Sequence, residues 1–396
     1  MQAAARFGFS RLLARYALIA NSVEAADEAV RLSPSDPDAH RARATVLTRQ
    51  QQYAEAVKSL ESATRLRSRD DVLWLELGNA REEVGDTAGA LAAFDQAVRW
   101  APHYGHTHWQ RGNLLLRMGR TGEAFGALRT AVEANRSYLP NLIDLAWGIS
   151  REDLKATDEL IRIKDDTDRL ALIRYLAKKG KGNDVRAQLR LISAPLSKED
   201  KDEVVRLLFA AKAFNDAFDL WTPNMYYRKP SVFNHGFEES KILTEPGFGG
   251  WFLSPAQSKI RVAIDVAQKF GGTKSLQLNF DGEWNPGTPL ISQTVLVEPA
   301  KVYPITFSLK TKALATGGPL MLAVYDAGSG ELLGKSDNFP STDSWATLNF
   351  EFTTLETSRA AVIRLQRSNC NSSPCPIFGT VWLDEISIGP SKDARQ

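Results

Sequence analysis

Residues 71–104 read DVLWLELGNAREEVGDTAGALAAFDQAVRWAPHY, and the pattern of this stretch returns with a period of about 34 residues in the first part of the chain. Small residues carry the pattern, at Gly78, Ala90 and Ala97. A step of one period in either direction again meets small residues, at Gly112, Ala124 and Ala131 or at Ala44, Ala56 and Ala63. Short side chains at these positions let paired helices approach closely. The stretch therefore predicts a stack of helical hairpins.

This ladder resembles the tetratricopeptide repeat, and the resemblance covers about residues 22–138. One step further back lies Ala29, with Pro34 in the turn between repeats, so a partial repeat is expected at the start. After residue 138 the ladder fades while helical periodicity continues, which predicts degenerate or capping helical hairpins over residues 139–222. The resemblance implies an α-solenoid over residues 1–222 that binds protein partners on its concave face.

After Trp221 the sequence changes to short β-patterned runs between Gly, Pro, Asn and Asp residues. We predict eight strands, at residues 259–267, 275–280, 291–297, 303–312, 320–326, 346–353, 360–366 and 379–388. Strands at this spacing are typical of an antiparallel β-sandwich of the jelly-roll type, here over residues 223–390 with a tail at 391–396. The predicted fold class is multidomain, a helical solenoid followed by a β-sandwich.

Five short motifs stand in order in this second half. They are residues 233–238 (FNHGFE) with Trp251, Gly272 with 275–278 (SLQL), Tyr303 with Phe307, Trp345 before 349–352 (NFEF), and 381–388 (VWLDEISI). The ordered set resembles the carbohydrate-binding modules of the family 4, 9 and 22 type, which are galactose-binding-like jelly rolls. The resemblance covers roughly residues 231–389 and implies that the β-sandwich binds a glycan.

Sugar recognition needs a flat aromatic surface flanked by amides and carboxylates. Trp284 lies in a segment without a burial pattern, so we predict an exposed indole there, and the alternative is a packed loop anchor. The polar residues beside it are Asp281, Glu283 and Asn285. Of the other tryptophans of this half, Trp345 and Trp382 are expected in the core, and the resemblance implies that Trp251 is buried.

A second group of candidate sugar-binding residues lies on the predicted strands. They are Gln293, Tyr325, Arg364 and Gln366. Strand alternation alone does not say which face of a sheet is open. We therefore expect these side chains to line an open sheet face without assigning that face.

The same resemblance implies a structural calcium ion near the first and last strands. Glu238 and Asp384 match the ligand positions, and backbone carbonyls near Lys274 supply further oxygens. Ca²⁺ takes roughly six to eight oxygen ligands from such groups. The alternative is that both carboxylates cap loops.

Cys370 and Cys375 are the only cysteines, five positions apart in a loop-forming segment. We predict a disulfide between them, and the alternative is two unrelated thiols. A disulfide suits an oxidising compartment. Residues 1–20 predict an amphipathic helix rather than a signal peptide. From the cysteine pair and from where such modules usually meet their ligands, we nevertheless expect an extracytoplasmic location, periplasmic or in the cell envelope, with an anchor or signal that is not in this sequence.

Composition restricts the classes of function. The net charge of +2 argues against a nucleic-acid partner, and no apolar run is long enough to span a membrane. Common enzyme motifs are missing. The leading hypothesis is a non-enzymatic binding protein of bacterial envelope polysaccharide synthesis, export or anchoring. Its solenoid binds a protein and its sandwich a glycan. The alternatives are an assembly scaffold whose sandwich binds no sugar, and a glycoside hydrolase with an unrecognised carboxylate pair.

Overall fold

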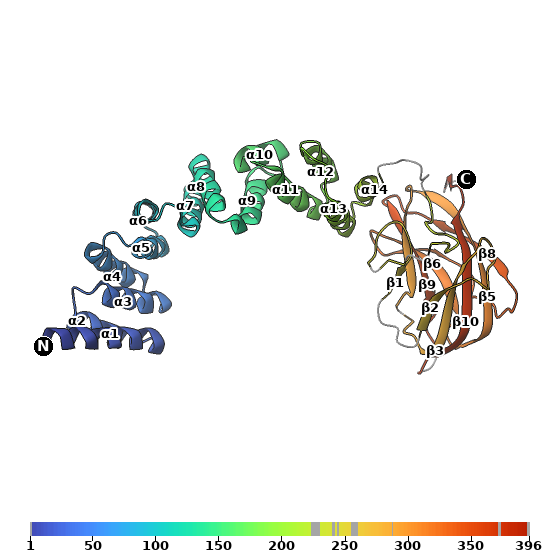
Figure 1. Cartoon of the computed structure of the whole chain (residues 1–396), viewed down its shortest axis with the longest axis horizontal. Helices are drawn as coiled ribbons and strands as arrows, with labels where there is room; N and C mark the ends of the chain where they lie inside the picture. The colour runs from blue at the N-terminus through green and yellow to red at the C-terminus, as the bar shows by residue number, and fades with distance from the viewer. Residues whose placement is uncertain are drawn as a thin grey trace. The chain divides into compact units, whose positions relative to one another are not determined.

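The computed structural model describes residues 2–222, 230–239, 242–243, 245–254, 260–286, 288–370 and 374–393, without the side chains of residues 2–5 and 283 (Figure 1). Contacts divide the chain into two compact units, residues 1–175 and 176–396. Each unit is described by itself below.

The first unit consists of helices joined by short turns. They are α1 (Gln2–Ala20), α2 (Val23–Leu32), α3 (Pro37–Arg49), α4 (Tyr53–Leu66), α5 (Asp71–Glu83), α6 (Thr87–Trp100), α7 (Gly105–Arg117), α8 (Thr121–Ala134), η1 (Arg136–Tyr138), α9 (Leu139–Ile149), α10 (Leu154–Ile161) and α11 (Asp166–Lys178), which runs across the division.

The starting points of these helices follow the period of the sequence. Helices α3, α5 and α7 begin at positions 37, 71 and 105, and helices α4, α6 and α8 begin at positions 53, 87 and 121. Both series advance by one sequence period at each step, so the predicted period is confirmed. Helix α9 begins at position 139, one further period after α7, so the spacing continues one step beyond the ladder of small residues.

The small residues of the repeat lie where helices pack most closely. A Cβ atom at Gly78 would overlap the Phe94 ring, and one at Gly112 would overlap the Leu128 side chain. The matching alanines Ala90 and Ala97 are fully buried. Close packing of this kind leaves no room for larger side chains, which explains why the pattern recurs at each step.

The second unit begins with helices α12 (Gly182–Leu189), α13 (Lys198–Ala210) and α14 (Phe214–Trp221). Helix α14 packs on residues that precede the first strand: the ring centroids of Trp221 and Phe233 are 5.1 Å apart, and those of Phe218 and Phe248 are 5.2 Å apart. Gly249 has a φ of +86°, and a Cβ atom there would overlap the Trp221 indole. Helix gives way to strand after Trp221, whereas the second compact unit begins at residue 176. The aromatic contacts of α14 lie within that unit.

Strands make up the rest of the second unit. They are β1 (Phe252–Leu253), β2 (Ile260–Asp265), β3 (Ser275–Glu283), β4 (Ile291–Leu296), β5 (Lys301–Thr316), β6 (Leu320–Asp326), β7 (Leu332–Lys335), β8 (Ala346–Thr353), β9 (Ala360–Arg367), β10 (Pro376–Ile388) and β11 (Lys392–Asp393). All eight predicted strands are present, and the sequence missed the short β1, β7 and β11.

The strands form two antiparallel sheets with a hydrophobic core between them. One sheet has the order β1-β4-β9-β6-β7, and the other has the order β11-β5-β10-β3-β2 with β8 paired to β5. Phe307 and Leu383 from the second sheet meet Leu322 and Ile363 from the first in one buried cluster. The predicted β-sandwich is therefore confirmed. Across the described residues of both units, no helix is long and apolar enough to cross a membrane.

Candidate functional site

Three of the predicted sugar-binding residues meet on the outer face of the five-stranded sheet. Strands β6 and β9 are neighbours, with Ala323 opposite Arg364 and Met321 opposite Gln366. Because side chains alternate along a strand, Tyr325, Arg364 and Gln366 point away from the core that Ile363 and its neighbours fill. All three side chains are partly exposed.

These three side chains hold one another in place. Gln366 Nε2 lies 2.9 Å from the Tyr325 phenol oxygen, and the Arg364 guanidinium carbon lies 4.6 Å from the centre of the Tyr325 ring. Burial lowers the pKa of the Arg364 guanidinium, and the nearby Tyr325 phenol only partly opposes that effect. The result is an oriented aromatic ring between an amide and a guanidinium. We refer to this group as the Tyr325 cluster.

Gln293 does not belong to this cluster, and its assignment to an open sheet face is wrong. It is 1% exposed and lies on the inner face of β4, in line with Ile291 and Val295. Its amide bonds to the Phe233 backbone, accepting the N–H at 2.6 Å and donating to the carbonyl oxygen at 2.9 Å. Gln293 therefore ties the segment before β1 to the five-stranded sheet.

The expectation of an exposed Trp284 is also wrong. The side chain is 1% exposed, stacks on Phe280 with ring centroids 5.8 Å apart, and donates its indole N–H to the Thr288 carbonyl at 2.9 Å. The inward positions of β3 are Leu276, Leu278 and Phe280, so the same alternation reaches Trp284. This every-second-residue pattern was the signal in the sequence for burial of Trp284. The turn-like composition of residues 281–283 made the strand appear to end before it.

The polar residues around Trp284 therefore have no exposed indole to flank. Asp281 and Asn285 are exposed, at the end of β3 and directly after Trp284. The side chain of Glu283 lies outside the described residues. Burial of Trp284 leaves this end of β3 without the predicted sugar platform.

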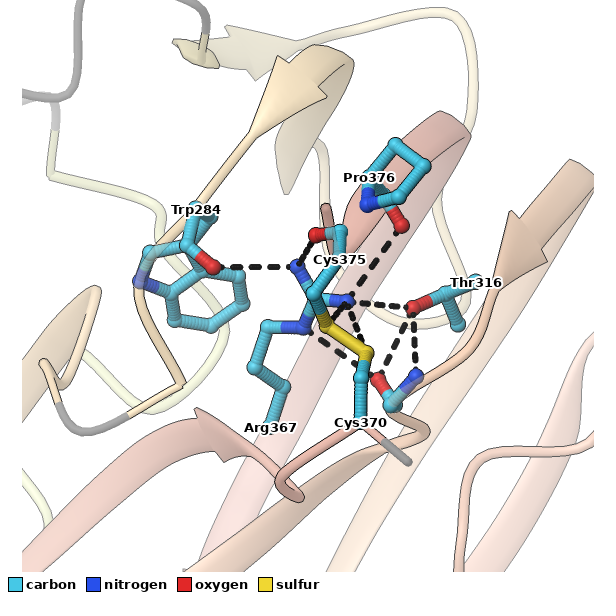
Figure 2. The surroundings of a disulfide bond; sticks show 7 residues. Trp284, Thr316, Arg367, Cys370, Cys375 and Pro376 are labelled. Carbon is cyan, nitrogen blue, oxygen red and sulfur yellow. Dashed lines mark hydrogen bonds between the residues drawn. A yellow bond between two sulfur atoms is a disulfide. The ribbon is translucent and has the colours of Figure 1, made fainter. Parts of the chain in front are cut away.

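A buried arginine explains how the end of β3 is held (Figure 2). Arg367 is 2% exposed and donates to the carbonyl oxygens of Trp284 at 3.0 Å and Cys375 at 2.9 Å. It also donates to the Thr316 hydroxyl at 2.9 Å and to the Pro376 carbonyl at 3.3 Å. Burial lowers the pKa of this guanidinium. Arg367 thus joins the ends of β3 and β5 to the start of β10.

The two cysteines lie beside that guanidinium. Cys370 and Cys375 are joined by a disulfide with Cα atoms 5.8 Å apart, and Arg367 Nη2 lies 2.8 Å from the Cys375 sulfur. A Cβ atom at Gly318 would overlap the Ser368 carbonyl oxygen, which keeps this position small. The disulfide therefore closes a packed corner of the sandwich (Figure 2).

The candidate calcium ligands face a loop instead of one another. Glu238 accepts backbone N–H groups of Thr273 at 2.7 Å and Lys274 at 3.2 Å. Asp384 accepts the N–H groups of Phe270 at 2.8 Å and Gly271 at 3.0 Å, and burial raises its pKa. Among the residues that the structure describes, no three His, Cys, Asp or Glu side chains gather as metal ligands. The geometry fits loop capping better than a cation cage, and the calcium ion stays a prediction.

The remaining tryptophans of the sandwich differ from one another. Trp251 is buried, as expected, and stacks on Phe237. Trp382 is buried too, but it lies on the outer face of the six-stranded sheet, under Lys310. The expectation that Trp345 is a core residue is wrong, because it is partly exposed and lies against Phe270. No pattern in the sequence pointed to Phe270.

The helical unit contains a hollow of about 320 Å³ among α3, α4 and α5. Thr45, Thr48 and Asn79 line it with hydroxyl and amide groups, and Arg49 and Glu76 add charges of opposite sign. A surface that offers donors and acceptors beside small apolar side chains suits an extended peptide backbone.

Comparison with known protein families finds one match in the helical part of the chain and one in the β-sandwich. The tetratricopeptide repeat model matches residues 9–71 and 75–139, and the carbohydrate binding domain model matches residues 229–372. Tetratricopeptide repeats thus precede a carbohydrate-binding-type jelly roll. No curated protein sequence matches the chain.

Solved structures of both kinds resemble parts of the chain. The crystal structure of MamA protein aligns at 14% identity with a TM-score of 0.36, over 46% of this chain and 94% of that one. A structure described as "CBM4 structure and function" aligns at 16% identity with a TM-score of 0.30, over 40% and 99%. The CBM22-1 xylan-binding domain from Paenibacillus barcinonensis Xyn10C aligns at 20% identity with a TM-score of 0.29, over 41% and 96%.

The two matched families indicate the general function of each region. Tetratricopeptide repeats suggest protein interaction, and the carbohydrate-binding-type domain suggests that the chain binds carbohydrate. Neither family is catalytic. The Tyr325 cluster lies within the second match, which places an oriented aromatic ring on the surface of the carbohydrate-binding-type domain.

Proposed function

We propose that this chain is a non-enzymatic binding protein whose β-sandwich holds a polysaccharide at the Tyr325 cluster while its tetratricopeptide repeats hold a protein partner. The observation that carries the proposal is the fixed contact among Tyr325, Arg364 and Gln366 on the outer face of the five-stranded sheet. A pyranose ring has apolar C–H faces and polar hydroxyl groups, so it needs both kinds of surface at once.

The cluster places an aromatic ring, a guanidinium and an amide side by side, with Arg364 over one face of the Tyr325 ring. Arg364 and Gln366 already fix the Tyr325 ring, so little side-chain entropy is lost when a sugar binds. The guanidinium has five N–H donors in a planar fork, and those not engaged with the ring are available to sugar hydroxyls.

The repeats supply the protein-binding half of the proposal. The hollow among α3, α4 and α5 has Asn79 on its wall, and an amide side chain can both donate to and accept from a peptide backbone. We assign this hollow to an extended segment of a partner protein.

We place the protein in the bacterial cell envelope, in the synthesis, export or anchoring of polysaccharide. The disulfide between Cys370 and Cys375 supports an oxidising compartment, because thiols are kept reduced in the cytosol. A glycan-binding sandwich beside protein-binding repeats suits a component that holds polysaccharide near its assembly machinery.

Affinity electrophoresis of the full chain in gels with soluble xylan, β-glucan or galactomannan tests the glycan site. We expect at least one polysaccharide to retard the wild-type chain, and Tyr325→Ala to weaken that retardation roughly tenfold. Phe378→Ala is the matched control, since its ring is 46% exposed on β10, in the other sheet. Retention of full binding by Tyr325→Ala would move the site elsewhere. A folded wild-type chain that no polysaccharide retards would favour the assembly scaffold.

A further inference from the structure

The loop between β2 and β3, residues 266–274, is held by three carboxylates from separate parts of the sandwich. Asp265 accepts two N–H groups at the beginning of the loop, at 2.7 and 3.1 Å. Asp384 accepts two in the middle, at 2.8 and 3.0 Å, and Glu238 accepts two at the end, at 2.7 and 3.2 Å. Hydrogen bonds to ionised acceptors are about twice as strong as neutral ones. We call residues 266–274 the carboxylate-held loop.

This well-fixed loop displays apolar side chains to solvent. Phe270 is 52% exposed and Val266 is 65% exposed. The Phe270 ring lies against Trp345, with centroids 5.9 Å apart and planes tilted by 53°. Trp345 directly precedes β8 and is partly exposed. Two aromatic rings from distant parts of the chain thus form one exposed surface.

Polar groups are fixed beside this aromatic surface. Lys310 Nζ donates to Gln268 Oε1 at 2.9 Å and lies 5.9 Å from the centre of the Trp382 ring. The Trp382 indole N–H donates to Asp265 at 2.8 Å, and the Gln277 amide donates to the same carboxylate oxygen at 3.2 Å. These contacts attach the carboxylate-held loop to the outer face of the six-stranded sheet.

We propose that Phe270 and Trp345 form a second sugar-binding subsite, on the outer face of the six-stranded sheet, for pyranose units of a polysaccharide. The inference rests on the proposed glycan-binding function of the sandwich. Two tilted rings offer C–H contacts to a sugar that turns between successive units. Lys310 and Gln268 supply hydrogen-bonding groups beside the rings.

The two subsites belong to different sheets of one sandwich. The Tyr325 cluster lies on β6 and β9, whereas the second subsite rests on β5, β10 and the loop before β3. The core lies between the two sheets, so their outer faces point in opposite directions. Each chain therefore engages two polysaccharide strands, or two parts of one strand. Bivalent binding raises the apparent affinity and cross-links the polymer.

The test uses the full chain and the polysaccharide that retards the wild type most strongly in the xylan, β-glucan and galactomannan panel. We compare Phe270→Ala, Trp345→Ala, Tyr325→Ala and the double variant Tyr325→Ala/Phe270→Ala. Tyr104→Ala is the exposed-aromatic control here, because Tyr104 is 47% exposed and lies in the helical repeats, outside the sandwich. Phe270→Ala is expected to weaken retardation roughly threefold to tenfold. The double variant is expected to bind more weakly than either single variant. We also expect the wild type and the control to make the polysaccharide solution turbid by cross-linking, and Phe270→Ala, Trp345→Ala and Tyr325→Ala each to abolish that turbidity.

The outcomes separate this inference from the proposed function. Wild-type binding and turbidity in Phe270→Ala and Trp345→Ala, with loss in Tyr325→Ala, would overturn the second subsite and leave the first standing. Absence of wild-type binding would overturn both. Thermal melting checks that each variant is folded, and should Trp345→Ala melt early, Phe270→Ser at the more exposed ring decides the question.

Discussion

Contacts within the helical repeats and contacts within the β-sandwich join residues at very different separations along the chain. In the repeats, ion pairs such as Arg41 with Glu76 join residues about one period apart, 35 positions in this case. In the sandwich, Arg367 reaches back 83 positions to Trp284, and Asp384 reaches back 114 positions to Phe270. Structure that depends on neighbouring segments is predictable from a period, whereas structure that depends on distant segments is not.

The largest effect is expected from Arg367→Met in the sandwich. The variant keeps the length of the side chain but leaves the Trp284 and Cys375 carbonyls and the Thr316 hydroxyl without their donor. We expect the free energy of unfolding of the second unit to fall by roughly 3 kcal/mol. Hydrogen exchange read by mass spectrometry should show lost protection at the ends of β3 and β5 and the start of β10. Protection lost at only one of these places would contradict the role of Arg367 as a long-range tie.

A smaller and local effect is expected from Gly78→Ala in the repeats. The added methyl group would overlap the Phe94 ring, which costs roughly 1–2 kcal/mol. Gly126→Ala is the matched control in α8, because its new methyl group would meet no atom within 4 Å. That control should stabilise the helix by roughly 0.5–1 kcal/mol. Hydrogen exchange should change around α5 and α6 in the first variant, and the comparison breaks if both substitutions shift stability in the same direction.

The smallest effect is expected from calcium. An ion at Glu238 and Asp384 would add one more long-range tie to the sandwich, but both carboxylates already accept loop N–H groups. We therefore expect Ca²⁺ or a chelator to move the melting temperature of the full chain by less than about 1 °C. A bound ion at 100 times its dissociation constant would instead add about 2.7 kcal/mol. A rise of several degrees, lost in Asp384→Asn, would restore the cage that the family resemblance implies.

The alternation of side chains between the two faces of a strand explains which site residues could be predicted from the sequence. Leu276, Leu278 and Phe280 on β3 and Trp284 just after its end all occupy even-numbered positions, which face the core. Burial of Trp284 was therefore predictable once the strand was allowed to extend through residues 281–283. The same parity argument puts Tyr325 on one face of β6, and puts Arg364 and Gln366 on one face of β9. It could not show that this face is the outer one, because that depends on where the other sheet packs.

The sequence by itself determined the repeats, the eight predicted strands and the change from helix to strand after Trp221, since each follows from a period or from local chain chemistry. Only the tertiary structure decided that Gln293 is buried, that α14 packs on Phe248, and that Phe270 meets Trp345. The physical reason is the same in each case. These contacts join side chains that no period relates, and their burial depends on the packing of segments far apart in the chain.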